Sequence, residues 1–245
     1  MTKWVRLYVT VEGQSEKEFA DKALKPHLAA FAIDVRSRVV MTNRKLGKRG
    51  GVLDFDKIRG DVTRLMKQDA HVEARFTTMV DLYALPSEFP GWSEARKKSV
   101  PRERVQVLEQ ALAKEFAEPR FLPFIQLHEF EALLFCGLEE LQRRIAGSEA
   151  GIETLRAEVA GMAPEEINDG ATTAPSKRII RYLPIYERNK VRVGALAAAA
   201  IGLDTLRVSV TPSTCLVHKC DDAKTMTLMQ RVRSAWLQMG PSWPG

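Results

Sequence analysis

The chain has 245 residues, 45% of them hydrophobic, which is enough to bury a substantial core without disulfide bonds. No apolar run reaches the ~18–20 residues that span a bilayer, and three cysteines do not make a disulfide framework. We therefore expect a cytoplasmic protein that is neither secreted nor anchored in a membrane. The formal charge of +6 favours a polyanion, such as a nucleic acid, as a partner.

The first elements expected are a strand over residues 5–11 and a helix over residues 15–28. Ser15 and Glu18 have the spacing of a capping box at the start of this helix, and Pro26 is expected to kink or end it. Strands are then predicted over two further segments, and a helix and a glycine-bearing basic loop lie between them. These segments are, in chain order, strand 31–41, loop 42–51, helix 55–66 and strand 70–80.

Residues 84–101 contain several prolines and are expected to form a long irregular segment. The remaining elements are predicted as follows: helix 101–116, strand 120–127, helical turn 130–135, helices 138–145 and 152–162, a polar loop 163–177, and helices 177–183 and 193–201. The alternation of strands and helices predicts an α/β fold with a mostly parallel central sheet flanked by helices, and a helical C-terminal part. We expect an α/β domain over residues 1–145, a helical extension packed on it over 146–210, and an atypical tail over 211–245.

Acidic residues stand at the ends of two predicted strands that are far apart in the sequence. Glu12 follows the first strand and Asp81 follows the strand 70–80, while Glu129 and Glu131 occur in a later apolar run. In α/β sheets, ligands bind beyond the carboxyl ends of the strands. Carboxylates in apolar surroundings are costly to bury without a positive partner, and a hard divalent cation with oxygen ligands would supply one. The alternative is that Glu12 caps a helix and Asp81 begins a turn.

Basic residues lie in several clusters that suit contacts to a phosphate backbone. The clusters are Arg36 and Arg38; Arg44, Lys45, Lys48 and Arg49; Arg96, Lys97 and Lys98 with Arg102 and Arg104; Lys177, Arg178 and Arg181; and residues 188–192. Of these, the loop with Arg44, Lys45, Lys48 and Arg49 and the helix start with Lys177 and Arg178 are the candidate nucleic-acid contacts. A mobile charged loop and a solvated helix face are the alternatives.

Several motifs together resemble a bacterial Toprim-like family labelled as a domain of unknown function, and the likeness runs from the N-terminus to about Arg207. The motifs are VEGQSE at residues 11–16, TMVDLYALP at 78–86, FPG at 89–91, QLHEFEALLF at 126–135 and APSKR at 174–178. The Toprim fold also occurs in primases, topoisomerases and nucleases of the overcoming-lysogenization-defect type. Members of the resembled family are often encoded beside ATPases of the ABC or AAA type and are suspected to act in defence against mobile DNA.

The resemblance implies that Glu12 corresponds to the first-strand glutamate of Toprim proteins and Asp81 to the first aspartate of their Asp-x-Asp pair. The second aspartate is absent, because position 83 is Tyr83. Glu129 and Glu131 are our candidates for the missing oxygen ligands. We therefore expect a Mg²⁺ or Mn²⁺ site formed by Glu12, Asp81, Glu129 and Glu131, in which the metal activates water for phosphodiester hydrolysis. His128 is a candidate general base or ligand, with a structural histidine as the alternative.

Other chemistries find little support in the sequence. Cys215, His218 and Cys220 provide three of the four ligands that a structural zinc site needs, and no partner cluster is present. There is no Gly-x-Ser-x-Gly elbow and no phosphate-binding loop of the Walker type, so any ATP hydrolysis would come from a partner. The leading hypothesis is a nuclease subunit that acts on DNA with an ATPase partner. The runner-up is a non-catalytic module that binds nucleic acid or the ATPase; a small-phosphate enzyme and a homodimer are left open.

Overall fold

The computed structural model describes residues 3–40, 54–127, 129–162, 164, 167 and 173–209. Three sets of residues from the sequence analysis lie outside these ranges. They are the basic loop residues Arg44, Lys45, Lys48 and Arg49; His128; and the tail 211–245, which includes Cys215, His218 and Cys220.

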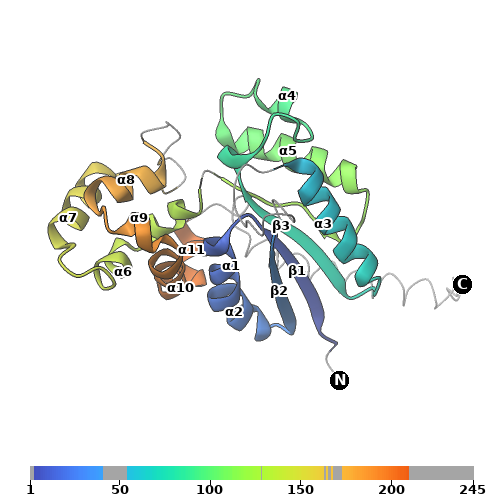
Figure 1. Cartoon of the computed structure of the whole chain (residues 1–245), viewed down its shortest axis with the longest axis horizontal. Coiled ribbons are helices and arrows are strands. Elements are labelled where there is room, and N and C mark those ends of the chain that lie inside the picture. Colours follow the sequence, from blue (N-terminus) through green and yellow to red (C-terminus); the bar gives the residue numbers. More distant parts are fainter. Residues whose placement is uncertain are drawn as a thin grey trace, which may run out of the picture.

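A parallel sheet of five strands forms the centre of the protein, which confirms the mostly parallel central sheet that the sequence predicts (Figure 1). The strands are β1 Val5–Val11, β2 Ile33–Val39, β3 Ala74–Asp81, β4 Phe121–Leu122 and β5 Ile125–Gln126. Their order is β2-β1-β3-β4, and β5 also pairs with β3. The chain leaves β1 towards β2 and then returns past β1 to form β3, so the direction of winding reverses between β1 and β3.

The two faces of the sheet carry separate hydrophobic cores, each covered by its own helices. Val5, Val9 and Val11 of β1 face one core, which is covered by α1 Gln14–Phe19 and α2 Lys25–Ala29. Phe76 and Val80 of β3 face the other core, which is covered by α3 Phe55–Gln68 and α5 Pro101–Phe116. Strand β3 is buried along almost its whole length, as is usual for the interior strand of a parallel sheet.

The predicted helix 15–28 is one continuous helical segment of three parts. Between α1 and α2 lies a π-helical turn, η1 Ala20–Leu24, and Pro26 occupies the first turn of α2. Proline has no backbone N–H, so it removes one hydrogen bond from a helix, and the neighbouring π-turn accommodates this loss. The helical segment therefore continues through Pro26 to Ala29. The predicted capping box of Ser15 and Glu18 is wrong, because the helix begins one residue earlier and Glu16 makes the capping contact instead.

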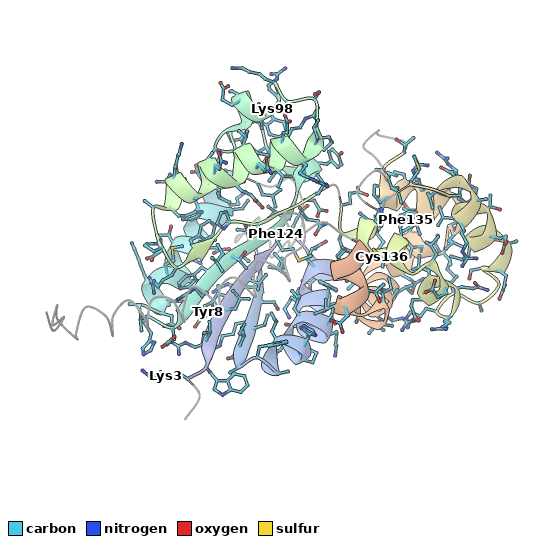
Figure 2. All side chains as sticks on the ribbon, turned by 180° about the vertical axis from the view of Figure 1, so that it is seen from behind. Lys3, Tyr8, Lys98, Phe124, Phe135 and Cys136 are labelled. Atoms are coloured by element: carbon cyan, nitrogen blue, oxygen red, sulfur yellow. The ribbon has the colours of Figure 1, made fainter. Side chains whose placement is uncertain are left out.

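The predicted strand 120–127 is split into β4 and β5, with Pro123 between them. Proline has no backbone N–H to donate, so it interrupts the pairing with β3. The irregular segment after β3 contains a 3₁₀-helix, η2 Leu82–Ala84, and a short helix, α4 Trp92–Ala95, which packs on α5. Figure 2 shows Lys98 at the outer tip of this α4–α5 region.

The second half of the chain adds a group of short helices beside α1 (Figure 1). They are η3 Phe130–Cys136, α6 Leu138–Gln142, α7 Glu149–Glu158, α8 Pro175–Tyr182, α9 Tyr186–Asn189, η5 Lys190–Gly194, α10 Ala195–Ile201 and α11 Leu203–Ser209. One hydrophobic core runs from β1 through these helices, and Figure 2 shows Phe135 and Cys136 where the helical group begins. Within the described ranges, no helix has both the length and the apolar character needed to cross a bilayer.

Candidate functional site

Glu12 and Asp81 lie together at the point where the winding of the sheet reverses. Glu12 directly follows β1, and its backbone N–H still donates to the Met79 carbonyl of β3. Asp81 is the last residue of β3, and its backbone N–H donates to Glu12 Oε2 at 3.3 Å. Ligands of open α/β sheets bind at such a reversal, beyond the carboxyl ends of the strands. The two acidic residues predicted from strand ends therefore share one location.

One oxygen of the Asp81 side chain has no hydrogen-bond partner among the described residues. This atom, Oδ1, is buried. A buried acceptor without a partner is costly, and the cost is larger for a carboxylate than for a neutral group. An orphaned carboxylate oxygen at this position is what a bound cation would satisfy.

Glu16, which the sequence analysis did not select, also belongs to the site. It lies in the first turn of α1, is 7% exposed, and its Oε2 accepts the Gly13 backbone N–H at 2.9 Å. A Cβ atom at position 13 would lie 2.9 Å from that same oxygen, so the glycine permits the close approach. The only sequence signal for Glu16 is its spacing of three residues from Gly13 at a helix start.

Glu129 and Glu131 reach the site from the segment that leads into η3. Glu131 is buried, whereas Glu129 is partly exposed and its Oε2 accepts the Ser176 backbone N–H at 2.9 Å. Ser176 lies in the first turn of α8, where a negative charge is favoured by the helix dipole. The helix start that the sequence assigns to a phosphate therefore holds a carboxylate of the protein itself.

Two further residues, Lys190 and Tyr186, contact Glu131 from the helical group. Lys190 Nζ lies 3.5 Å from Glu131 Oε1, and the buried Tyr186 hydroxyl donates to the same oxygen at 3.5 Å. Lys190 is the first residue of the π-helical turn η5, a rare conformation that is frequent at functional sites. In the sequence Lys190 belongs to a basic cluster that suits a polyanion, but in the structure its ammonium group contacts an acidic side chain of the protein.

The five carboxyl groups of Glu12, Glu16, Asp81, Glu129 and Glu131 form what we call the acidic cluster. Burial raises the pKa of Glu12 to about 7, with Glu16, Glu129 and Glu131 adding to the effect and the Asp81 N–H opposing it. Burial, reinforced by the neighbouring carboxylates, also raises the pKa of Asp81 well above its usual range. Neighbouring carboxylates in a partly buried site disfavour one another's ionisation, which favours either protonation of Glu12 and Asp81 or the uptake of a cation.

Burial raises the pKa of Glu131, but Lys190 opposes this rise through its positive charge. The pKa of Glu16 is also raised by burial, while its hydrogen bonds and Lys190 favour the charged form. Burial and the nearby Glu131 raise the pKa of the Tyr186 hydroxyl, so this group stays protonated and acts as a donor. The single positive charge of Lys190 thus offsets part of the negative charge of several carboxylates.

The acidic cluster fits a hard divalent cation by its chemistry, since every candidate ligand is a carboxylate oxygen and one such oxygen is orphaned. Its side chains are not yet arranged as a metal centre: in the part of the chain that the structure describes, no three acidic, histidine or cysteine side chains converge in that way. The backbone N–H groups of Gly13, Asp81 and Ser176 each hold one carboxylate oxygen. Binding would therefore recruit the second oxygens or rotate the side chains.

The remaining predicted site residues are placed as follows. Lys177 is exposed on α8, whereas Arg178 pairs with Glu158 and donates to the Thr173 carbonyl at 2.8 Å. Arg178 is thus engaged within the protein. Tyr83 is 38% exposed in η2. Arg44, Lys45, Lys48, Arg49 and His128 lie outside the described residues.

Comparison with known protein families gives a match over most of the chain. A family model described as "Domain of unknown function (DUF4276)" matches residues 11–213, a stretch that runs from the last residue of β1 and contains β2 to β5, the acidic cluster and the helical group. No curated protein and no solved structure matches the chain.

Proposed function

The chain belongs to the DUF4276 family, and we propose that it is a divalent-metal-dependent nuclease subunit that hydrolyses phosphodiester bonds. The observation that carries the proposal is the orphaned, buried Oδ1 of Asp81 beside Glu12 at the reversal point of the sheet. The resemblance to Toprim-like proteins is part of the proposal, and it assigns these same two positions to metal binding. A DNA substrate, an ATPase partner of the ABC or AAA type and a role in defence against mobile DNA also rest on that resemblance.

In this proposal Glu12 and Asp81 hold Mg²⁺ or Mn²⁺, and Glu129 or Glu131 supplies a further oxygen. The metal, when bound, would polarise a phosphoryl oxygen and acidify a bound water. The residues of the chain would partly bury the metal and hold its ligands in position. The β1–β3 pairing fixes Glu12 relative to Asp81, and the Asp81 N–H orients Glu12 by holding one of its oxygens. Deprotonation of Glu12, whose pKa is about 7, then accompanies cation binding near neutral pH.

A second function, a non-catalytic module that binds nucleic acid or the ATPase, is favoured by two observations. Tyr83 stands where the Toprim pair has its second aspartate. The described acidic side chains also lack the convergence of a formed metal centre. In this alternative the acidic cluster no longer binds a metal, and some of its carboxyl groups stay protonated instead.

Nicking of supercoiled plasmid by the full chain with Mn²⁺ separates these functions. We expect Glu12→Gln and Asp81→Asn to reduce nicking at least ~100-fold, since each removes one ligand of the metal ion that would stabilise the charge of the transition state. Glu153→Gln is the matched control, because Glu153 is 83% exposed on α7, a helix that contributes no residue to the acidic cluster. A parent protein that binds DNA without nicking it, with binding unchanged in both site variants, would instead identify the module.

A further inference from the structure

We propose that Lys190 is an internal counter-cation: its ammonium group neutralises the acidic cluster in the metal-free protein and leaves Glu131 when a divalent cation binds. The inference rests on the proposed function in one respect, namely that the acidic cluster is the cation site. It adds that the site has its own competing positive charge, supplied by the C-terminal helical group.

The contacts of Lys190 suit this role. Its Nζ atom lies 3.5 Å from Oε1 of Glu131, a side chain that is only 9% exposed. Its charge also acts favourably on the Glu16 carboxylate in α1. Lys190 therefore acts on carboxylates from two elements, η3 and α1, which are far apart in the sequence. A buried carboxylate that lost this partner with nothing in exchange would be strongly disfavoured.

The Lys190 side chain can also leave without unfolding any element. It is 35% exposed, and a lysine carries its charge on a long flexible stem that readily turns towards water. Glu131 Oε1 would keep a partner after the exchange, because the Tyr186 hydroxyl donates to the same atom at 3.5 Å. Tyr186 is completely buried, so its hydroxyl stays in place. The exchange therefore costs Glu131 its ionic partner but not its hydrogen bond.

Coulomb repulsion opposes the presence of both cations at the site. A divalent ion among these carboxylates and an ammonium group a few ångströms away repel each other strongly in a partly buried site, where screening by water and salt is weak. Metal binding must therefore either displace Lys190 or be weakened by it. Removing the charge of Lys190 should accordingly tighten the binding of the metal.

Calorimetric titration of the full chain with Mn²⁺ tests the inference. We expect Lys190→Met, which removes the charge and keeps the stem, to bind Mn²⁺ ~10-fold more tightly than the wild type or better. Lys190→Arg, which keeps the charge, should bind like the wild type. Lys114→Met is the matched control, since Lys114 is exposed on α5. Unchanged or weaker Mn²⁺ binding by a folded Lys190→Met protein overturns the inference, because a merely structural lysine would not tighten it.

A second experiment uses the wild-type protein, so its result does not depend on whether a variant folds. Acylation of lysines, read by mass spectrometry, should label Lys190 several-fold faster after Mn²⁺ is added, while Lys114 is labelled at the same rate. Equal labelling of Lys190 with bound Mn²⁺ would contradict the exchange. If the wild type binds no Mn²⁺, the proposed function fails; binding gained by Lys190→Met would then still support the counter-cation, and its absence would overturn both.

Discussion

The backbone N–H of Asp81 donates to the Glu12 carboxylate at 3.3 Å, although the two residues are 69 positions apart in the sequence. Each stands at the end of a strand, and β1 and β3 are neighbours in register, with Val11 paired to Met79. The sheet topology alone therefore brings the two side chains together. The remaining members of the acidic cluster are added by helix starts and by the helical group.

Amide replacements in the acidic cluster should stabilise the metal-free protein at pH 8. Asp81→Asn and Glu12→Gln each remove a partly buried, ionisable group of raised pKa and leave an isosteric amide that can still accept a hydrogen bond. We expect both variants to melt at least a few degrees above the wild type at pH 8 in EDTA, as followed by circular dichroism. A lower melting temperature for both would show that the carboxylates stabilise the empty site.

The stability of the metal-free wild type should fall as the pH rises from about 5 to about 7.5. A carboxyl group whose pKa is higher in the folded protein binds its proton more tightly there than in the unfolded chain, so folding is favoured below the folded pKa and loses this contribution above it. For Glu12 this loss of stability occurs between the pKa of an ordinary glutamate and its raised pKa of about 7. One pKa unit of difference corresponds to about 1.4 kcal/mol.

Carboxylates with lowered pKa, such as Asp69 and Glu118, lose their contribution only at more acidic pH and do not obscure this window. Urea denaturation at a series of pH values checks the slope. It should flatten in Glu12→Gln, whereas Glu153→Gln should follow the wild type. A wild-type stability that rises between pH 5 and 7.5 would contradict the raised pKa values.

Mn²⁺ should stabilise the wild type more at pH 8 than at pH 5.5, which opposes the pH dependence of the metal-free protein. A ligand that binds only the folded protein stabilises it by about 2.7 kcal/mol at 100 times its Kd, which is a rise of about 5–10 °C in melting temperature for a chain of this size. We expect this rise at pH 8 in the wild type, a smaller one at pH 5.5 where protons compete, and none in Asp81→Asn. Ca²⁺ at the same concentration tests for selectivity. Equal stabilisation of the wild type and Asp81→Asn would place the cation elsewhere.

Gly194 is required for the position of the Tyr186 hydroxyl. A Cβ atom at position 194 would lie 2.5 Å from that hydroxyl oxygen, and Tyr186 is fully buried and has no room to retreat. We expect Gly194→Ala to cost about 1–3 kcal/mol in the free energy of unfolding. Adding Tyr186→Phe, which removes the hydroxyl, should recover much of the loss.

Gly60 provides the control for this pair of variants. It lies inside α3, and a Cβ atom there would meet nothing within 4 Å. Gly60→Ala should therefore stabilise the protein by up to about 1 kcal/mol through helix propensity. Additive effects of Gly194→Ala and Tyr186→Phe in the double variant would rule out the contact as the cause.

The sequence was sufficient to predict the α/β class, because the strands and their acidic ends are local patterns. It predicted the parallel sheet and the proximity of Glu12 and Asp81, since parallel strands end at one edge. It did not reveal Glu16, whose role depends on a helix that starts one residue earlier than its apolar spacing suggests. The contact of Lys190 with Glu131 was not predicted for a different reason: it depends on a π-helical turn and on packing between distant segments, which no periodicity encodes.

Diffraction from a crystal soaked in Mn²⁺, with the anomalous signal recorded, tests the central claim most directly. We predict a Mn²⁺ ion among the acidic cluster, with Oδ1 of Asp81 and one carboxylate oxygen of Glu12 at about 2.0–2.2 Å, and with Lys190 turned away from Glu131. An acidic cluster without an anomalous peak at saturating Mn²⁺, or a peak that Asp81 does not touch, would contradict the account.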